Sequence, residues 1–218
     1  MPLPGREARG TGKSLRSFTL GGKRRRRKIE QAVHLVIEWF VFPLWFAAGF
    51  ADYLFHRRTH IETHSGVGES LLHHLMLAEV GLPLIMAVFF RIDAALILLF
   101  IACFIAHEIT GNFDIRYAET HTRLVSATEE QVHSVLEIIP LTGALLVIVP
   151  HFGQAMALFG AGPEHADFSV ALKAPPDYRK LLFFGILLLL FVLAPYTEET
   201  IRCLRADKHA KIGFKPAE

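Results

Sequence analysis

The long apolar runs of this chain constrain its fold more than any other feature. Residues 94–106 and 181–193 contain almost no side chain that could face water. Each run approaches the roughly 20 residues that a helix needs to cross a bilayer. Hydrophobic residues make up 52% of the 218 residues and charged residues only 20%, which argues against a soluble globular protein. The sequence therefore predicts an integral membrane protein.

The apolar segments predict an all-α, polytopic membrane helix bundle with four to five transmembrane helices. We expect them at 32–55, 75–90, 94–109, 129–158 and 181–194. Only Arg91, Ile92 and Asp93 separate the second segment from the third, so these two form a hairpin. Ser126 followed three residues later by Glu129 is the capping-box pattern and predicts the start of the fourth helix.

The positive charge of the chain is concentrated at its start. Residues 1–30 carry 10 Lys and Arg but only two acidic residues, and 23–28 is an unbroken basic run. No apolar core of a signal peptide is present there. Because a transmembrane helix follows directly, we expect a disordered tail on anionic lipid rather than on nucleic acid. The expected organisation is a tail at 1–30, a histidine-rich membrane domain at 31–205 and a tail at 206–218, in the cytoplasmic (inner) membrane of a bacterium.

The chain contains 12 histidines, an unusual number for such an apolar sequence. If the first four segments each cross once, the stretches 55–75 and 109–133 emerge on one side, opposite Arg91 and residues 159–180. Eight histidines fall on that side, at the ends of four helices: His56, His60, His64, His73, His74, His107, His121 and His133. The remaining four are expected to be interfacial residues: His34, His151, His165 and His209.

The spacing of these histidines relative to carboxylates supports a shared site. Asp52, His56 and His60 recur at i, i+4 and i+8, which places them on one stripe of a helix that continues past the first segment. Similar groupings are Glu69 with His73, His107 beside Glu108, and Glu129 or Glu130 with His133 and Glu137. Imidazole and carboxylate together suit iron, zinc or manganese, and the lack of paired Cys argues against a thiolate site.

The predicted metal ligands are the eight histidines together with Glu130. Four carboxylates are expected to orient ligand histidines through their free N–H groups: Asp52, Glu69, Asp114 and Glu137. Glu108 and Glu130 are the candidate catalytic acids or bases. A structural polar network without metal is the alternative. Inside the first segment, Glu38 is costly in lipid unless paired, and His34, one turn earlier, is its expected partner.

The residues 52–60, which read Asp-Tyr-Leu-Phe-His-Arg-Arg-Thr-His, resemble the first histidine box of the membrane fatty acid hydroxylase and sterol desaturase superfamily. His73-His74 resembles the paired histidines that end the second box. The third box of the family is absent, and His107-Glu108, His121 and Glu130-x-x-His133 stand in its place. Carboxylates would therefore have to complete the site. The resemblance covers about residues 50–137. It implies two iron ions at helix ends and O2 activated to attack a C–H bond of a membrane lipid.

The leading hypothesis is therefore a di-metal, di-iron oxidoreductase that hydroxylates or desaturates a lipid chain. Its electrons come from a separate donor protein, because the chain has no flavin or nicotinamide fingerprint and no cysteine cluster for iron and sulfur. One alternative is a zinc-dependent membrane hydrolase with Glu108 or Glu130 as base. A third class is non-catalytic, either a metal transporter or a haem-binding membrane protein. Zinc or manganese are the alternative metals.

Overall fold

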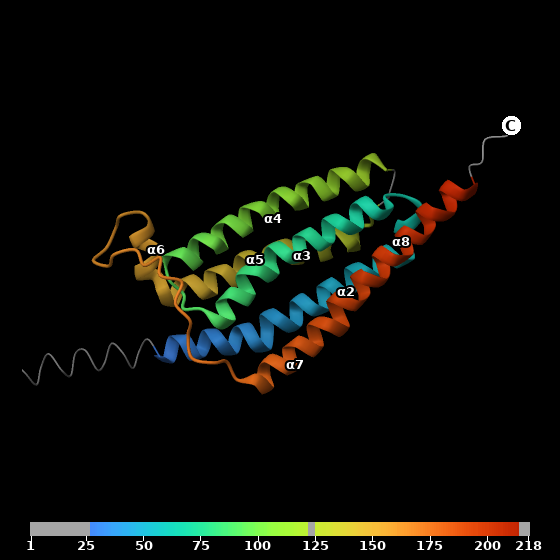
Figure 1. The fold of residues 1–218 in the computed structure, drawn as a ribbon. Helices are drawn as coiled ribbons and strands as arrows, with labels where there is room; N and C mark the ends of the chain where they lie inside the picture. The colour runs from blue at the N-terminus through green and yellow to red at the C-terminus, as the bar shows by residue number, and fades with distance from the viewer. Residues whose placement is uncertain (1–26, 122–124, 214–218) are drawn as a thin grey trace, which may run out of the picture.

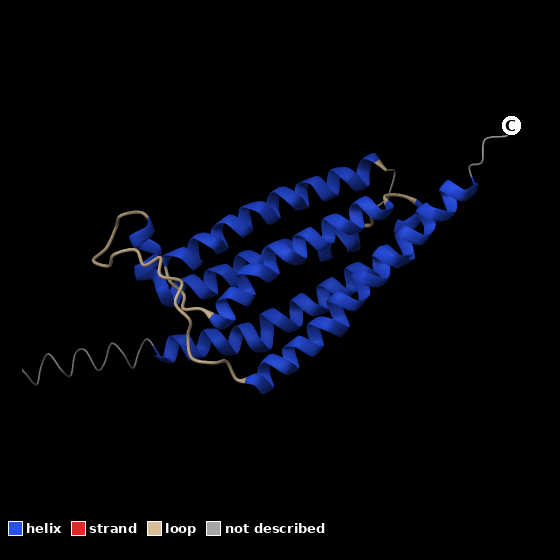
Figure 2. Ribbon diagram, in the orientation of Figure 1, coloured by secondary structure: helices blue, strands red, loops and turns tan. Residues whose placement is uncertain are grey.

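The computed structural model describes residues 27–121 and 125–213. The basic tail before Arg27, its expected contact with anionic lipid, and the last five residues lie outside this part. The described part is all-α and contains no strand, which confirms the predicted fold class (Figure 2). Its elements are η1 (Ile37–Val41), α2 (Phe42–Arg58), η2 (Ile61–Thr63), α3 (Gly66–Phe89), α4 (Ala94–Thr120), α5 (Ala127–Ile148), η3 (Val149–His151), α6 (Phe152–Leu158), α7 (Tyr178–Leu188), η4 (Leu189–Leu193) and α8 (Ala194–Gly213).

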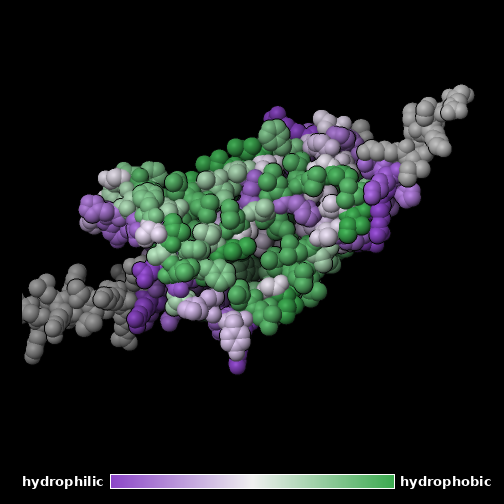
Figure 3. Space-filling view, viewed as in Figure 1, coloured by the Kyte–Doolittle hydropathy of each residue, from purple (hydrophilic) through white to green (hydrophobic). Residues whose placement is uncertain are grey.

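The long helices lie alongside one another as a bundle (Figure 1). Helices α3 and α4 form the predicted hairpin, α5 packs on α2 and α4, and the continuous α7–η4–α8 helix lies against α2 and α3. Five helical segments are long and apolar enough to cross a membrane: Arg27–Arg58, Gly66–Phe89, Ala94–Thr120, Ala127–Leu158 and Tyr178–His209. Hydrophobic residues cover most of the visible face with a few hydrophilic residues among them, and further hydrophilic residues gather toward its two ends (Figure 3).

Two π-helical segments interrupt the long helices, one directly before α2 and one directly before α8. The π-helical segment η1 ends just before Pro43, and η4 ends just before Pro195. Proline has no N–H and its ring collides with the carbonyl four residues earlier in a regular α-helix. A single π turn relieves this collision without breaking the helix. Each apolar helix therefore continues through its proline toward the same end of the bundle.

One end of the bundle is closed by the hairpin turn and by residues 159–177. Asp93 caps α4, with its Oδ1 accepting from the Leu96 N–H at 3.0 Å, and its Oδ2 accepts from the Val170 N–H at 3.1 Å. The Arg91 N–H donates to the Ala171 carbonyl at 2.8 Å. The turn and this loop therefore lie at the same end of the bundle, as the alternation of the segments predicts.

Several element boundaries differ from the expectation. Helix α2 ends at Arg58, because His60 has a left-handed backbone with φ of 53° and cannot continue an α-helix. Helix α3 begins at Gly66, nine residues before the apolar run, and α4 extends to Thr120, well past its apolar part. Helix α8 continues to Gly213, past the expected end of the membrane domain at residue 205.

The partner of Glu38 is not the expected one. Its carboxylate oxygens lie 2.8 and 2.7 Å from the Nζ of Lys180, on the first turn of α7. The prediction that His34 pairs with Glu38 is therefore wrong. Sequence separation hid the true partner, since the pair is formed only when α7 returns to the start of the first helix.

Candidate metal centre

Eight ionisable residues meet at the end of the bundle opposite the hairpin turn. We call them the acid–histidine cluster: Asp52, His56, Glu69, His73, Asp114, Glu129, His133 and Glu199. They come from α2, α3, α4, α5 and α8. All are buried except His133, whose side chain is 14% exposed. Two groups of them bring ligand atoms within 4.8 Å of one another, and both groups include His56: Asp52, His56, Glu129 and His133 in one, and His56, Glu69 and His73 in the other.

Helical spacing explains why these residues face inward together. Three helices each contribute an acid and a histidine four residues apart: Asp52 and His56 on α2, Glu69 and His73 on α3, Glu129 and His133 on α5. Residues at i and i+4 lie on one face of a helix, one turn apart. Since the end of α2 and the starts of α3 and α5 meet at the same end of the bundle, the three faces converge on one point.

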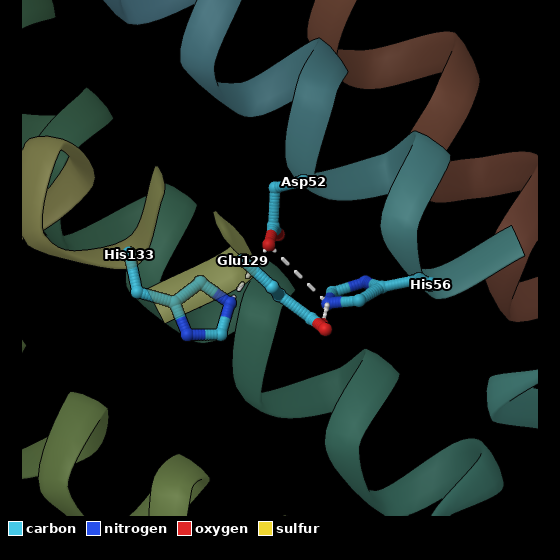
Figure 4. Close-up of side chains that lie close together, drawn as sticks. All are labelled: Asp52, His56, Glu129 and His133. Atoms are coloured by element: carbon cyan, nitrogen blue, oxygen red, sulfur yellow. Dashed lines mark hydrogen bonds and ion pairs between the residues drawn. The ribbon is translucent and has the colours of Figure 1, made fainter. Parts of the chain in front are cut away.

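The first group is centred on the carboxylate of Asp52 (Figure 4). Asp52 Oδ1 lies 2.8 Å from His133 Nε2 and 3.4 Å from His56 Nε2. Glu129 Oε1 lies 3.9 Å from the same His56 nitrogen. The predicted capping box of Ser126 and Glu129 is confirmed, because the Glu129 N–H donates to Ser126 Oγ at 3.2 Å. The cap that starts α5 therefore also places a carboxylate in the cluster.

Glu199 on α8 joins the two groups. Its Oε2 accepts from His56 Nδ1 at 2.9 Å, and its Oε1 accepts from His73 Nδ1 at 3.3 Å. An ionised carboxylate can only accept, so these contacts place the proton of each imidazole on Nδ1. Glu199 thus holds two histidines from different helices in one orientation. A carboxylate that fixes the tautomer of a histidine in this way is a common support of metal ligands.

The opposite nitrogens of these two histidines face carboxylates. With its proton on Nδ1, neutral His56 presents a lone pair at Nε2, and this buried atom has no hydrogen-bond partner within the described residues. Asp52 and Glu129 oxygens face it at 3.4 and 3.9 Å. His73 Nε2 faces Asp114 Oδ2 at 3.4 Å, and Asp114 Oδ1 is also buried without a hydrogen bond in this part of the chain. Lone pairs that point at carboxylates require a cation or a further proton between them. The residues present therefore fit a metal ion.

Tyr196 closes the cluster on the side of the membrane segments. Its buried hydroxyl donates to Asp52 Oδ2 at 2.9 Å, and its ring lies edge-on to His73 with the centroids 5.7 Å apart. It follows Pro195 directly, at the start of α8. Tyr196 thereby leaves Asp52 Oδ1 free to face the two histidine nitrogens.

A cavity of about 100 Å³ adjoins the cluster. The cluster contributes Asp52, His73, Asp114 and His133 to its polar wall. Its apolar wall, formed by residues of the membrane-spanning segments, includes Trp45, Met76, Leu77, Val80, Leu136 and Val192. The arrangement places a small, mostly apolar space directly beside the candidate metal ligands.

Six of the predicted site residues come together in the cluster. They are the histidines His56, His73 and His133 and the carboxylates Asp52, Glu69 and Asp114. Asp52 and Asp114 were expected to accept from the N–H groups of ligand histidines. Instead, they face the Nε2 atoms of His56 and His73, which carry no proton when Nδ1 donates to Glu199. The orienting role falls to Glu199.

Other predicted ligands lie elsewhere. His60 has a side chain that is 70% exposed and faces Glu62, because the helical stripe that would have aligned it with His56 ends at Arg58. His64 and His121 are exposed, and His121 stacks on Tyr117 with ring centroids 4.1 Å apart. The Nδ1 of His74 donates to its own helix, at the Ser70 carbonyl. The structure does not bring these four histidines into the cluster.

The two candidate catalytic glutamates are also separated from the cluster. Glu130 is exposed, because it lies one residue, about 100° around the helix, from Glu129. Glu108 lines the cavity together with Glu137 and His107, but none of the three belongs to the cluster. The Nδ1 of His107 lies 3.9 Å from Glu79 Oε2 instead.

Sequence reasoning did not identify Glu199 and Tyr196. The signal available was the polar stretch that directly follows the most apolar segment, since Tyr196 and Glu199 stand three residues apart and so share a helix face. Glu129 was only one of two alternatives, and burial selects it over Glu130.

Comparison of the chain with protein-family models, with curated proteins and with solved structures gives no match. The likeness to the fatty acid hydroxylase superfamily therefore depends on the short box at residues 52–60 and on the paired histidines at 73–74. Of the four histidines in these two motifs, His56 and His73 lie in the cluster and His60 and His74 do not.

Proposed function

We infer that this protein is a membrane-embedded oxidoreductase with a dinuclear metal centre in the acid–histidine cluster. The observation that carries this proposal is the position of Glu199, which accepts from two stacked imidazoles and leaves the Nε2 of each facing a carboxylate. One metal position would be held by Asp52, His56, Glu129 and His133. The adjacent position would be held by Glu69 and His73, which form the second group with His56, and by Asp114, which faces His73 Nε2.

The donor set favours iron or manganese. It combines imidazole and carboxylate without thiolate, which suits metals of intermediate hardness. Pairs of acid and histidine on facing helices are also how soluble di-iron bundles build their sites, although those use a spacing of three residues and this chain uses four. When bound, a di-iron centre supplies the reduction of O2 that makes an unactivated C–H bond reactive.

The cavity beside the cluster supports oxidation over the other functions considered. Much of its wall is apolar. Of the two glutamates considered as the base of a hydrolase, Glu130 does not line the cavity and Glu108 lines it outside the cluster. Its volume of about 100 Å³ is well below the ~300–1,000 Å³ of pockets that hold ligands of drug or cofactor size, which disfavours haem. Hydroxylation would consume O2, two electrons and two protons, and would yield an alcohol and water. An external donor protein would supply the electrons.

Metal analysis of detergent-purified protein tests this proposal. We expect two iron ions per chain in the wild type, and O2 consumption that depends on an added reductant. As a control, the Glu119→Gln variant should keep the metal content and O2 consumption of the wild type, since Glu119 is an exposed carboxylate of α4 outside the cluster. One zinc per chain without O2 consumption would favour the hydrolase, and protein without metal would leave a protonated polar network as the explanation of the cluster.

A further inference from the structure

The cavity has a second polar region in addition to the cluster. Glu108 on α4 and Glu137 on α5 both line it, and both are also exposed on the surface of the bundle. The cavity therefore reaches the surface at these two residues. Neither carboxylate has a hydrogen bond or an ion pair to any residue in the described ranges 27–121 and 125–213, so both are available to a ligand.

The depth of this opening corresponds to the boundary of the bilayer. The apolar part of α4 ends at Ile109, and that of α5 begins at Ile138. Glu108 and Glu137 thus lie where the apolar segments change into the polar helix ends that carry the cluster. A carboxylate at the edge of the hydrocarbon is costly unless it has a partner, and such residues mark functional sites. Lipid headgroups and their charged groups occur at this depth.

A buried imidazole lies next to Glu108 in the wall of the cavity. His107 is only 8% exposed, lines the cavity and precedes Glu108. Its Nδ1 faces Glu79 Oε2 on α3 at 3.9 Å, so the charged groups at the opening are the two glutamates. Glu108 and Glu137 form a polar group at the opening that the apolar chain of a hydrocarbon would not satisfy. The opening therefore fits a ligand with a polar, positively charged group.

We propose that the substrate is an amphiphile with a protonated amine that binds between Glu108 and Glu137, so that oxidation occurs at a carbon close to this amine. This inference rests on the proposed function for the chemistry, but the binding site is independent of it. Glu137 follows His133 by four residues and Glu108 precedes Asp114 by six, which corresponds to about 6 and 9 Å along the helix axes. The reacting carbon consequently lies only a few bonds from the amine.

The volume of the cavity also limits how much of the substrate chain can enter it. An apolar cavity of roughly 150 Å³ accommodates benzene, and this cavity is about 100 Å³. It accommodates a short segment of chain, with the first carbons against Leu77, Val80 and Leu136, and leaves the rest of a long chain outside. A whole lipid or sterol does not fit inside it.

Binding of dodecylamine, dodecanol and dodecanoate tests the proposal. Trp45 lines the cavity, whereas Trp39 is exposed, so the emission of Trp45 in a Trp39→Phe background reports on occupancy. We expect dodecylamine to shift this emission saturably and to bind at least tenfold more tightly than dodecanoate. Glu108→Gln/Glu137→Gln should reduce the preference to less than twofold, and Glu119→Gln should leave it unchanged.

Three outcomes would overturn the proposal. These are equal or tighter binding of dodecanoate, dodecylamine binding that survives Glu108→Gln/Glu137→Gln, and displacement of dodecylamine by Mn²⁺ alone. Metal content measured on the same samples separates this site from the metal centre. Metal retained in Glu108→Gln/Glu137→Gln supports a separate amine site, and metal lost there assigns the two glutamates to the centre and contradicts the proposal. Selective amine binding by metal-free protein would support the amine site and contradict the proposed oxidoreductase.

Discussion

His56 on α2 and His73 on α3 lie parallel, with ring centroids 4.6 Å apart and ring planes inclined by 10°. Both donate from Nδ1 to the same carboxylate, that of Glu199 on α8. Stacked imidazoles with a common acceptor must direct their remaining nitrogens the same way, toward Asp52, Glu129 and Asp114. This relationship among three helices brings the two groups of ligand atoms together at His56.

Replacement of His56 should remove metal, and replacement of His60 should not. His56 belongs to both candidate ligand groups, whereas His60 is exposed after the end of α2. We expect His56→Ala to lower the metal content to near zero and His60→Ala to retain the wild-type stoichiometry, measured by elemental mass spectrometry on monodisperse detergent fractions. Loss of metal in both variants to the same extent would contradict the placement of the centre.

Glu199→Gln should weaken metal binding without abolishing it. The amide can still accept through its oxygen, but it cannot accept from both Nδ1–H groups or carry the balancing charge. Removal of such a supporting carboxylate typically costs about 10–100-fold in metal affinity. Competition with a chelator measures the affinity, and Glu119→Gln serves as the control. Affinities that are equal in the two variants would show that Glu199 has no role in the centre.

Ser126→Ala should destabilise the protein through α5. The Ser126 hydroxyl accepts from the Glu129 N–H, and loss of such a cap costs about 1 kcal/mol. The same change frees the end of the helix that carries Glu129 and His133, so metal affinity should fall as well. Thermal unfolding in detergent compares Ser126→Ala with Thr128→Ala, an exposed change in the same turn. A melting temperature that falls equally in both would contradict a capping role.

The ion pair between Glu38 and Lys180 should stabilise the contact between α7 and the first helix only modestly. Lys180 is 57% exposed, and exposed pairs are worth about 0.2–1 kcal/mol. A double-mutant cycle of Glu38→Gln and Lys180→Met measures the coupling, which should decrease at high salt. His34→Ala should have no coupling with Glu38→Gln. Coupling to His34 instead of Lys180 would contradict the observed pairing.

The sequence alone determined the class of the fold and the end of the bundle that carries the site. Apolar runs long enough to cross a bilayer left a helix bundle as the only fold that satisfies its backbone groups in lipid. The i, i+4 spacing within each helix is a local property, so Asp52 with His56 and Glu69 with His73 were predictable as pairs. So were the hairpin at residues 91–93 and the capping box at Ser126, because both depend on neighbouring residues.

Only the tertiary structure decided which residues of each helix meet. His60 follows the same spacing as His56, yet the chain turns at residue 60 and removes it from the helix. Glu129 and Glu130 are adjacent in sequence, and the rotation of α5 against α2 selects Glu129. Glu199 is 143 residues from His56, and Lys180 is 142 residues from Glu38. Such contacts depend on the packing of whole helices against one another, and local spacing carries no information about that packing.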